Sequence, residues 1–132
     1  MNTGIPRNAY ILVADGTRAI AFENIAEQRD LELRKLKILL PENLLDDGPA
    51  GKRPPEEDQR ATDEATFAKQ LAEHLNGITL NNDFRHLVLV ADPQTLGQIR
   101  PSLHSATEMR IVRSVNKTLT NSTVGDIERA LA

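Results

Sequence analysis

Two aspartates stand where carboxylates can hold divalent cations. Asp15 directly follows the apolar run 9–14, and Asp92 directly follows the apolar run 86–91. If both runs are neighbouring strands at the centre of a sheet, the two carboxylates lie close together at the ends of these strands. Paired carboxylates of this kind hold two divalent ions for phosphodiester cleavage. The sequence thus allows a metal-dependent phosphoesterase or nuclease that uses Asp15 and Asp92.

The same two aspartates also suit purely local roles. Asp15 is followed by Gly16, a pair typical of tight hairpin turns, and Asp92 is followed by a proline, as a helix N-cap often is. A third metal ligand would have to come from another segment, from Glu64 or Glu73. We therefore favour the local roles and keep metal-dependent chemistry as an alternative.

Other catalytic chemistries find little support in the residues. The sequence contains no cysteine, no Gly-x-Ser-x-Gly turn and no glycine-rich phosphate loop. Its histidines, at positions 74, 86 and 104, do not have the spacing of a metal-binding pair on one helix. The sequence predicts no catalytic residue and no cofactor, so enzyme activity is the less favoured interpretation.

Basic residues give a stronger argument, for binding. Three of them lie in the alternating segment 31–40 and three in the segment 41–61 that follows it: Arg34, Lys35, Lys37, Lys52, Arg53 and Arg60. If the two segments converge, they form a local cationic surface that can contact RNA phosphates. The alternative is that basic residues on an edge strand only discourage pairing with other sheets.

The order of elements predicts an α/β domain. Apolar runs and period-two alternation predict five strands, at 9–14, 17–23, 31–40, 86–91 and 109–115. Apolar residues at helical spacing predict helices from 62 or 63 to 77, from 93 to a break at 101, and over 123–131. We also expect a bulge at Arg34-Lys35 in the third strand, which should be an edge strand, and a long flexible loop at 41–61.

Three strands followed by alternating helices and strands imply a mixed sheet with helices on both faces. Five strands in this order are the arrangement of ribonuclease H-like domains. With 132 residues, the chain should form a single such domain over 1–132.

Composition bounds the possible partners. The net charge of −3 argues against a protein that coats nucleic acid indiscriminately, although a local basic face remains possible. The sequence begins Met1-Asn2-Thr3-Gly4 and contains no run of about 20 apolar residues. These features predict a cytoplasmic protein of bacterial type, with no signal peptide and no membrane contact.

Three stretches resemble the bacterial host attachment protein family, relatives of the archaeo-eukaryotic release-factor middle domain. They are Val13-Ala-Asp-Gly-Thr-Arg-Ala19 with Phe22-Glu-Asn24, then Leu87-Val-Leu-Val-Ala-Asp-Pro-Gln-Thr-Leu-Gly-Gln-Ile-Arg100, then Lys117-Thr-Leu-Thr120 with Asp126-Ile-Glu128. The resemblance implies a ribonuclease H-like fold and a role around translation or stalled ribosomes. The host attachment label describes a phenotype and implies no mechanism.

The sequence departs from the family pattern in places. The family tends to have proline at the position of Asp92 and aspartate at the position of Thr118. The Gly-Gly-Gln tripeptide of release factors does not occur in this sequence, so release-factor hydrolysis of peptidyl-tRNA is not implied. We predict a non-catalytic binding module that contacts the ribosome, its RNA or a protein partner. A structural homodimer that pairs through the third strand is a further alternative.

Overall fold

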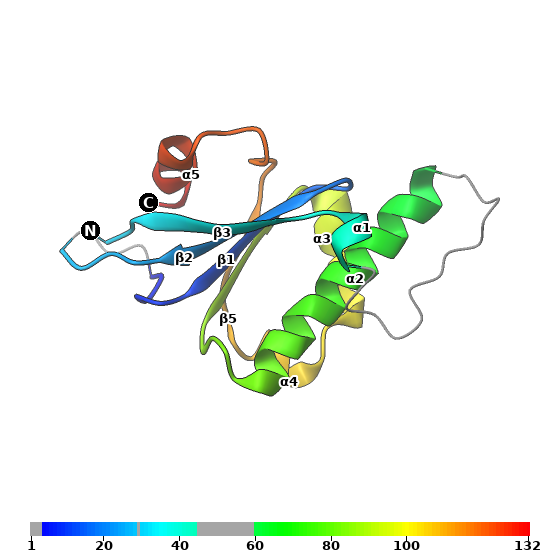
Figure 1. Cartoon of the computed structure of the whole chain (residues 1–132), viewed down its shortest axis with the longest axis horizontal. Helices are drawn as coiled ribbons and strands as arrows, with labels where there is room; N and C mark the ends of the chain where they lie inside the picture. The colour runs from blue at the N-terminus through cyan, green and yellow to red at the C-terminus, as the bar shows by residue number, and fades with distance from the viewer. Residues whose placement is uncertain (1–3, 29, 45–59) are drawn as a thin grey trace.

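The computed structural model of the chain describes residues 4–28, 30–44 and 60–132. Its strands are β1 (Tyr10–Ala14), β2 (Ala19–Asn24), β3 (Leu33–Leu39), β4 (Leu87–Ala91) and β5 (Ile111–Asn116). Its helices are α1 (Pro41–Leu44), α2 (Arg60–Asn81), α3 (Pro93–Ile99), the 3₁₀ turn η2 (Arg100–Ser102), α4 (Ser105–Glu108) and α5 (Val124–Leu131) (Figure 1).

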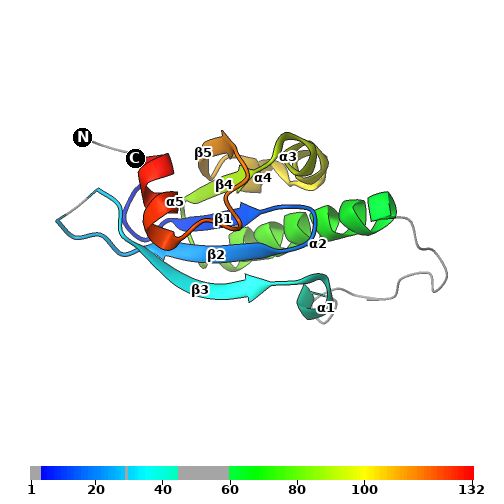
Figure 2. The ribbon, with the colours of Figure 1, turned by 90° about the horizontal axis from the view of Figure 1, so that it is seen from above.

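The five strands form one mixed sheet in the order β3-β2-β1-β4-β5. The first three strands pair antiparallel, whereas β1, β4 and β5 run parallel to one another. Figure 2 shows β3 at one edge of the sheet and β5 at the other. The predicted α/β class with a mixed five-stranded sheet is confirmed, and so is the edge position of the third strand.

Helices cover both faces of the sheet and create two apolar cores. Because side chains alternate along a strand, Leu12 and Leu89 face α2 and α3, while Ile11 and Val88 face α5. Both β1 and β4 are buried along their whole length, as their continuous apolar runs predicted. The result is a three-layer α/β/α arrangement, in which α5 is the only described helix on its face of the sheet (Figure 1).

The long helix differs from its prediction at both ends. It begins at Arg60 and continues past Gly77 to Asn81. A glycine inside a helix costs only about 1 kcal/mol, and burial of Ile78 in the core offsets that cost. The helix stops where Asn82 adopts a left-handed conformation, with φ of 58°. Among the described helices, none is both long and apolar enough to cross a membrane.

Both ends of the loop predicted over 41–61 are helical instead. Its first four residues form α1, which begins at Pro41 and packs Leu44 into the core. Its last two residues belong to α2. Residues 45–59 lie outside the described part of the chain, so the expected flexibility of this loop stays a prediction.

A bulge interrupts β3, as predicted, but not at the predicted residues. Lys35 lies opposite Phe22 and Lys37 lies opposite Ala21, so Leu36 is the extra residue. The expected Arg34-Lys35 position is therefore wrong by a residue or two. The position of the bulge depends on which residues of β2 lie opposite β3, and the alternation within β3 gives no information about those partners.

Candidate functional site

The surface formed by Arg34, Lys35 and Lys37, here named the cationic edge, lies on the outer strand of the sheet. All three side chains are exposed, and no described strand pairs with the outer side of β3. Opposed residues of an antiparallel pair point to the same face. Lys35 therefore points to the α5 face with Phe22, and Lys37 points to the α2 face with Ala21. The two lysines therefore project from opposite faces of the sheet along its β3 edge.

Arg34 differs from the two lysines because it already has an acidic partner. Its Nη2 lies 2.6 Å from Oε1 of Glu23, the residue opposite it on β2. This exposed ion pair offsets the charge of Arg34 and contributes little to stability. Within the described residues, Lys35 and Lys37 make no side-chain hydrogen bond or ion pair. The lysines therefore supply the uncompensated positive charge of the cationic edge.

The other predicted binding residues are not placed by the structure. Lys52 and Arg53 lie outside the described residues. Arg60 is the first residue of α2, but the position of its side chain is not described. Whether the loop cations converge with the cationic edge stays a prediction from the sequence.

Asp15 and Asp92 do follow neighbouring strands. Ala14 and Ala91 are paired at the carboxyl ends of β1 and β4, and each aspartate directly follows one of them. Asp92 is the N-cap of α3, and its Oδ2 accepts a hydrogen bond of 3.1 Å from the Thr95 N–H. This local role is the one that the Asp-Pro sequence favoured.

Asp15 joins two connections that lie far apart in the sequence. Its Oδ1 accepts hydrogen bonds from the N–H groups of Thr17 (2.7 Å) and Arg18 (3.0 Å) and from the Thr17 hydroxyl (2.9 Å). Its Oδ2 accepts one of 2.6 Å from the hydroxyl of Thr120. The Arg18 guanidinium donates to the Thr120 carbonyl (2.8 Å) and to Oδ1 of Asn121 (2.5 Å). Oδ1 of Asp15 thus fixes the β1–β2 turn, and Oδ2 joins this turn to the β5–α5 connection.

These hydrogen bonds make the contribution of Asp15 to stability dependent on pH. Burial opposes ionisation, but the hydrogen bonds from Thr120, Thr17 and Arg18 outweigh it, so the pKa of Asp15 is lowered. A lowered folded-state pKa stabilises the protein above the unfolded value, about 3.9, and this stabilisation is lost as pH falls through the folded pKa.

We expect Asp15→Asn to lower the free energy of unfolding at pH 7 by about 1 kcal/mol, because an amide nitrogen cannot accept from Thr120. Urea denaturation at pH 7 and at pH 3 measures the effect, which should shrink at pH 3. Asp83→Asn, which changes an exposed carboxyl, is the matched control and should have no effect. A difference of equal size at both pH values would contradict the assignment.

Metal binding by the two aspartates stays a prediction. Of the two proposed third ligands, Glu64 does reach the turn: a Cβ atom added to Gly16 would lie 2.8 Å from Cδ of Glu64. Glu73 is exposed elsewhere on α2. In the described part of the chain, no group of three or more His, Cys, Asp or Glu side chains could hold a metal ion.

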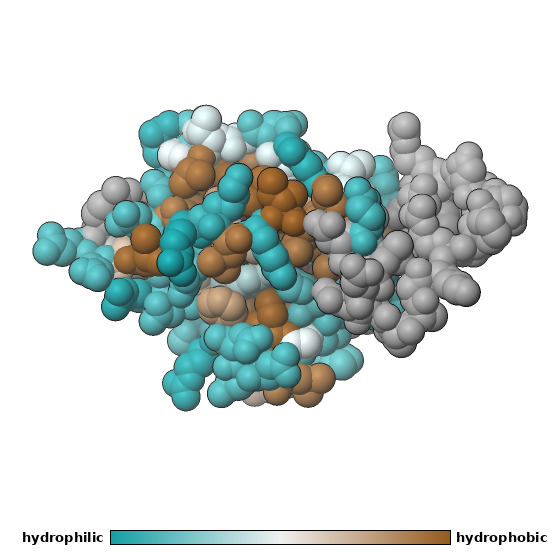
Figure 3. Space-filling model, in the orientation of Figure 1, coloured by the Kyte–Doolittle hydropathy of each residue, from teal (hydrophilic) through white to brown (hydrophobic). Residues whose placement is uncertain are grey.

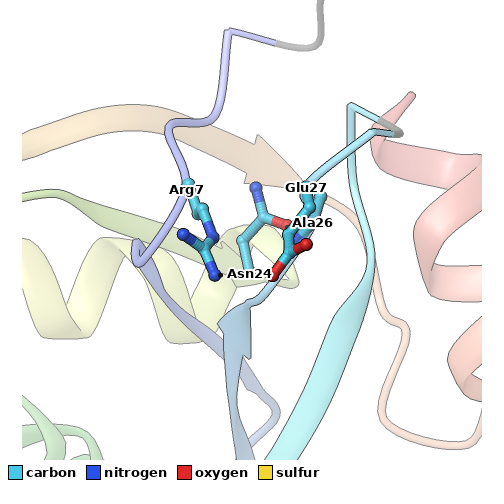
Figure 4. A network of polar contacts seen from close by, with 4 residues as sticks. All are labelled: Arg7, Asn24, Ala26 and Glu27. Carbon is cyan, nitrogen blue, oxygen red and sulfur yellow. Dashed lines mark hydrogen bonds and ion pairs between the residues drawn. The ribbon is translucent and has the colours of Figure 1, made fainter.

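Sequence reasoning missed a buried asparagine that shapes the start of β3. Asn24 donates through Nδ2 to the carbonyls of Ile5, Pro6 and Asp30, and its Oδ1 accepts from the N–H groups of Ala26 and Glu32. Figure 4 shows Asn24 beside the exposed ion pair between Arg7 and Glu27. No spacing rule distinguishes this asparagine from one on the surface, so the sequence offered no signal.

The fold and the cationic edge define a class: a three-layer α/β domain that presents a basic strand at the border of its sheet. Over residues 8–131 the chain matches the family model of bacterial archaeo-eukaryotic release factor family 12. The chain belongs to that family, and the predicted likeness to a release-factor domain is confirmed. No curated protein matches the chain.

Proposed function

We propose that this chain is a non-catalytic, translation-associated binding module that contacts phosphates of ribosomal RNA through the cationic edge. The observation that supports the proposal most directly is the position of Lys35 and Lys37. Both side chains are exposed, neither has an ion-pair partner among the described residues, and no described strand pairs with the outer side of their strand. Membership of a release factor-like family supports a translation-related role. The host attachment label of the sequence resemblance adds no mechanism to this proposal.

The aromatic residues favour contact with the RNA backbone over stacking on bases. Tyr10, Phe22 and Phe67 are each at most 2% exposed, and Phe84 is packed against the core. Proteins that bind single-stranded RNA by stacking need exposed aromatic rings. Lysines, in contrast, bind phosphates as point charges and release condensed counterions.

Sedimentation with purified bacterial ribosomes tests the proposal. Two phosphate contacts give a slope of about −1.4 to −1.8 in log affinity against log salt, or about a tenfold loss between 50 and 200 mM salt. We expect Lys35→Glu/Lys37→Glu to abolish pelleting at physiological salt. Lys69→Glu/Lys117→Glu, which makes the same change of net charge at exposed positions elsewhere, should pellet like the wild type.

Two outcomes would overturn the proposal. One is a protein that stays in the supernatant at both salt concentrations, and the other is equal loss of pelleting in both double variants. Sedimentation velocity of the chain alone is the companion measurement, because Leu36 and Ile38 on the same strand are 36% and 43% exposed. Figure 3, which views the molecule from the side of β3, shows hydrophobic surface between hydrophilic side chains on this face. A doubled mass that Lys35→Glu/Lys37→Glu abolishes would favour the homodimer that pairs through β3 instead.

A further inference from the structure

A polar depression lies at the amino ends of β4 and β5, away from the cationic edge. It has a volume of about 460 Å³ and is lined by Asn82, Arg85, His86 and Arg110. The first three come from the connection between α2 and β4, and Arg110 directly precedes β5. Figure 1 shows the end of α2 and the connection that leads from it into β4. Two guanidinium groups and one imidazole therefore share a single concave surface, and none of the described residues that line it carries a carboxylate.

One side of this depression is held in a fixed geometry. The Nη1 of Arg110 donates to Oδ1 of Asn82 (3.0 Å) and to the carbonyl of Phe84 (2.7 Å). Asn82 occupies the left-handed turn that ends α2. The ring centroids of Phe84 and the buried Tyr10 lie 4.8 Å apart. This contact anchors the turn to the core. The guanidinium of Arg110 is thus oriented before any ligand arrives.

The other side of the depression carries the side chains of Arg85 and His86. Within the described residues, the side chains of Arg85 and His86 make no hydrogen bond or ion pair. The main chain there is nevertheless fixed, because the carbonyl of His86 accepts a 2.9 Å hydrogen bond from the Tyr10 N–H. Asp83 lies in the same turn but does not line the depression. Positive charge is therefore concentrated here in a chain whose net charge is −3.

We propose that this depression binds a phosphate group. A guanidinium can donate two parallel N–H bonds to phosphate oxygens, and Arg110 and Arg85 present two such groups to one space. The imidazole of His86 adds a further nitrogen for hydrogen bonding. The site is independent of the cationic edge, because β3 and β5 are opposite edges of the sheet. The phosphate can be free or part of a nucleic-acid backbone, and the chemistry that recognises it is the same.

Titration followed by amide NMR tests the site. Inorganic phosphate, added at constant ionic strength against a chloride reference, should give saturable shifts for residues 82–87 and 110–111. Arg85→Gln should weaken binding about tenfold, the size expected for loss of a charged hydrogen bond. Arg7→Gln removes an exposed arginine that does not line the depression and should bind phosphate as the wild type does.

A dinucleoside monophosphate, which carries one phosphodiester, identifies the source of the phosphate. Tighter binding than that of inorganic phosphate would assign the site to a nucleic-acid backbone, and weaker binding would assign it to a free phosphate or phosphomonoester. Shifts that do not saturate, that chloride reproduces, or that Arg85→Gln leaves unchanged would overturn the proposal.

Discussion

Replacing Asn24 by alanine is expected to lower the free energy of unfolding by about 3 kcal/mol, and the melting temperature by about 10 °C. Asn24 is 1% exposed, and its amide joins three carbonyls and two N–H groups of the N-terminal segment and the β2–β3 connection. Alanine removes all five of these hydrogen bonds and takes away the acceptor of the buried Ala26 N–H, and an unsatisfied buried group costs about 1–3 kcal/mol.

Urea denaturation followed by circular dichroism measures this change, with Asn116→Ala as the control. Asn116 is exposed at the end of β5, so its replacement should change the free energy of unfolding by less than about 0.5 kcal/mol. Asn24→Asp should be at least as harmful as Asn24→Ala, because it turns a negative oxygen toward carbonyl groups. If Asn24→Ala is as mild as the control, the network does not stabilise the fold.

The amide of Asn24 also bears on the proposed RNA contact. One of its acceptors, the carbonyl of Asp30, and one of its donors, the N–H of Glu32, lie in the segment that leads into β3. Loss of the network should therefore loosen the entry to β3 and, with it, the geometry of the cationic edge.

Replacing Asn76 by alanine is expected to lower the free energy of unfolding by about 2 kcal/mol. Asn76 is buried on α2, where its Nδ2 donates to the carbonyl of Ser102 (3.1 Å). Its Oδ1 accepts from the N–H of His104 (2.9 Å) and the hydroxyl of Thr107 (2.8 Å). One amide thus holds η2 and α4 against the long helix.

Hydrogen exchange distinguishes this local role from a general loss of stability. In Asn76→Ala, amides of residues 103–109 should exchange faster than those of β1 and β4, which the core protects. Asn81→Ala, an exposed position on the same helix, is the matched control. Uniform acceleration across the whole chain, or none at residues 103–109, would contradict the role assigned to Asn76.

Local patterns predicted the elements that local interactions determine. The continuous apolar runs of β1 and β4 predicted strands buried on both faces, and the Asp-Pro pair predicted the start of α3. In each case the sequence pattern lies within a few residues of the hydrogen bond or the buried side chains that it predicts. The end of α2 was missed because continuation of the helix past Gly77 depends on the burial of Ile78 in the core, which only the tertiary structure shows.

The sequence by itself determined the α/β class, the edge strand with its basic residues, and the family resemblance. Only the tertiary structure decided that Asp15 binds Thr120, that Asn24 and Asn76 close buried networks, and that Arg85 and Arg110 share one depression. The physical reason is the distance along the sequence between the residues that interact. Periodicity and capping report interactions between near neighbours, whereas these polar contacts join segments whose proximity exists only once the sheet and its covering helices have packed.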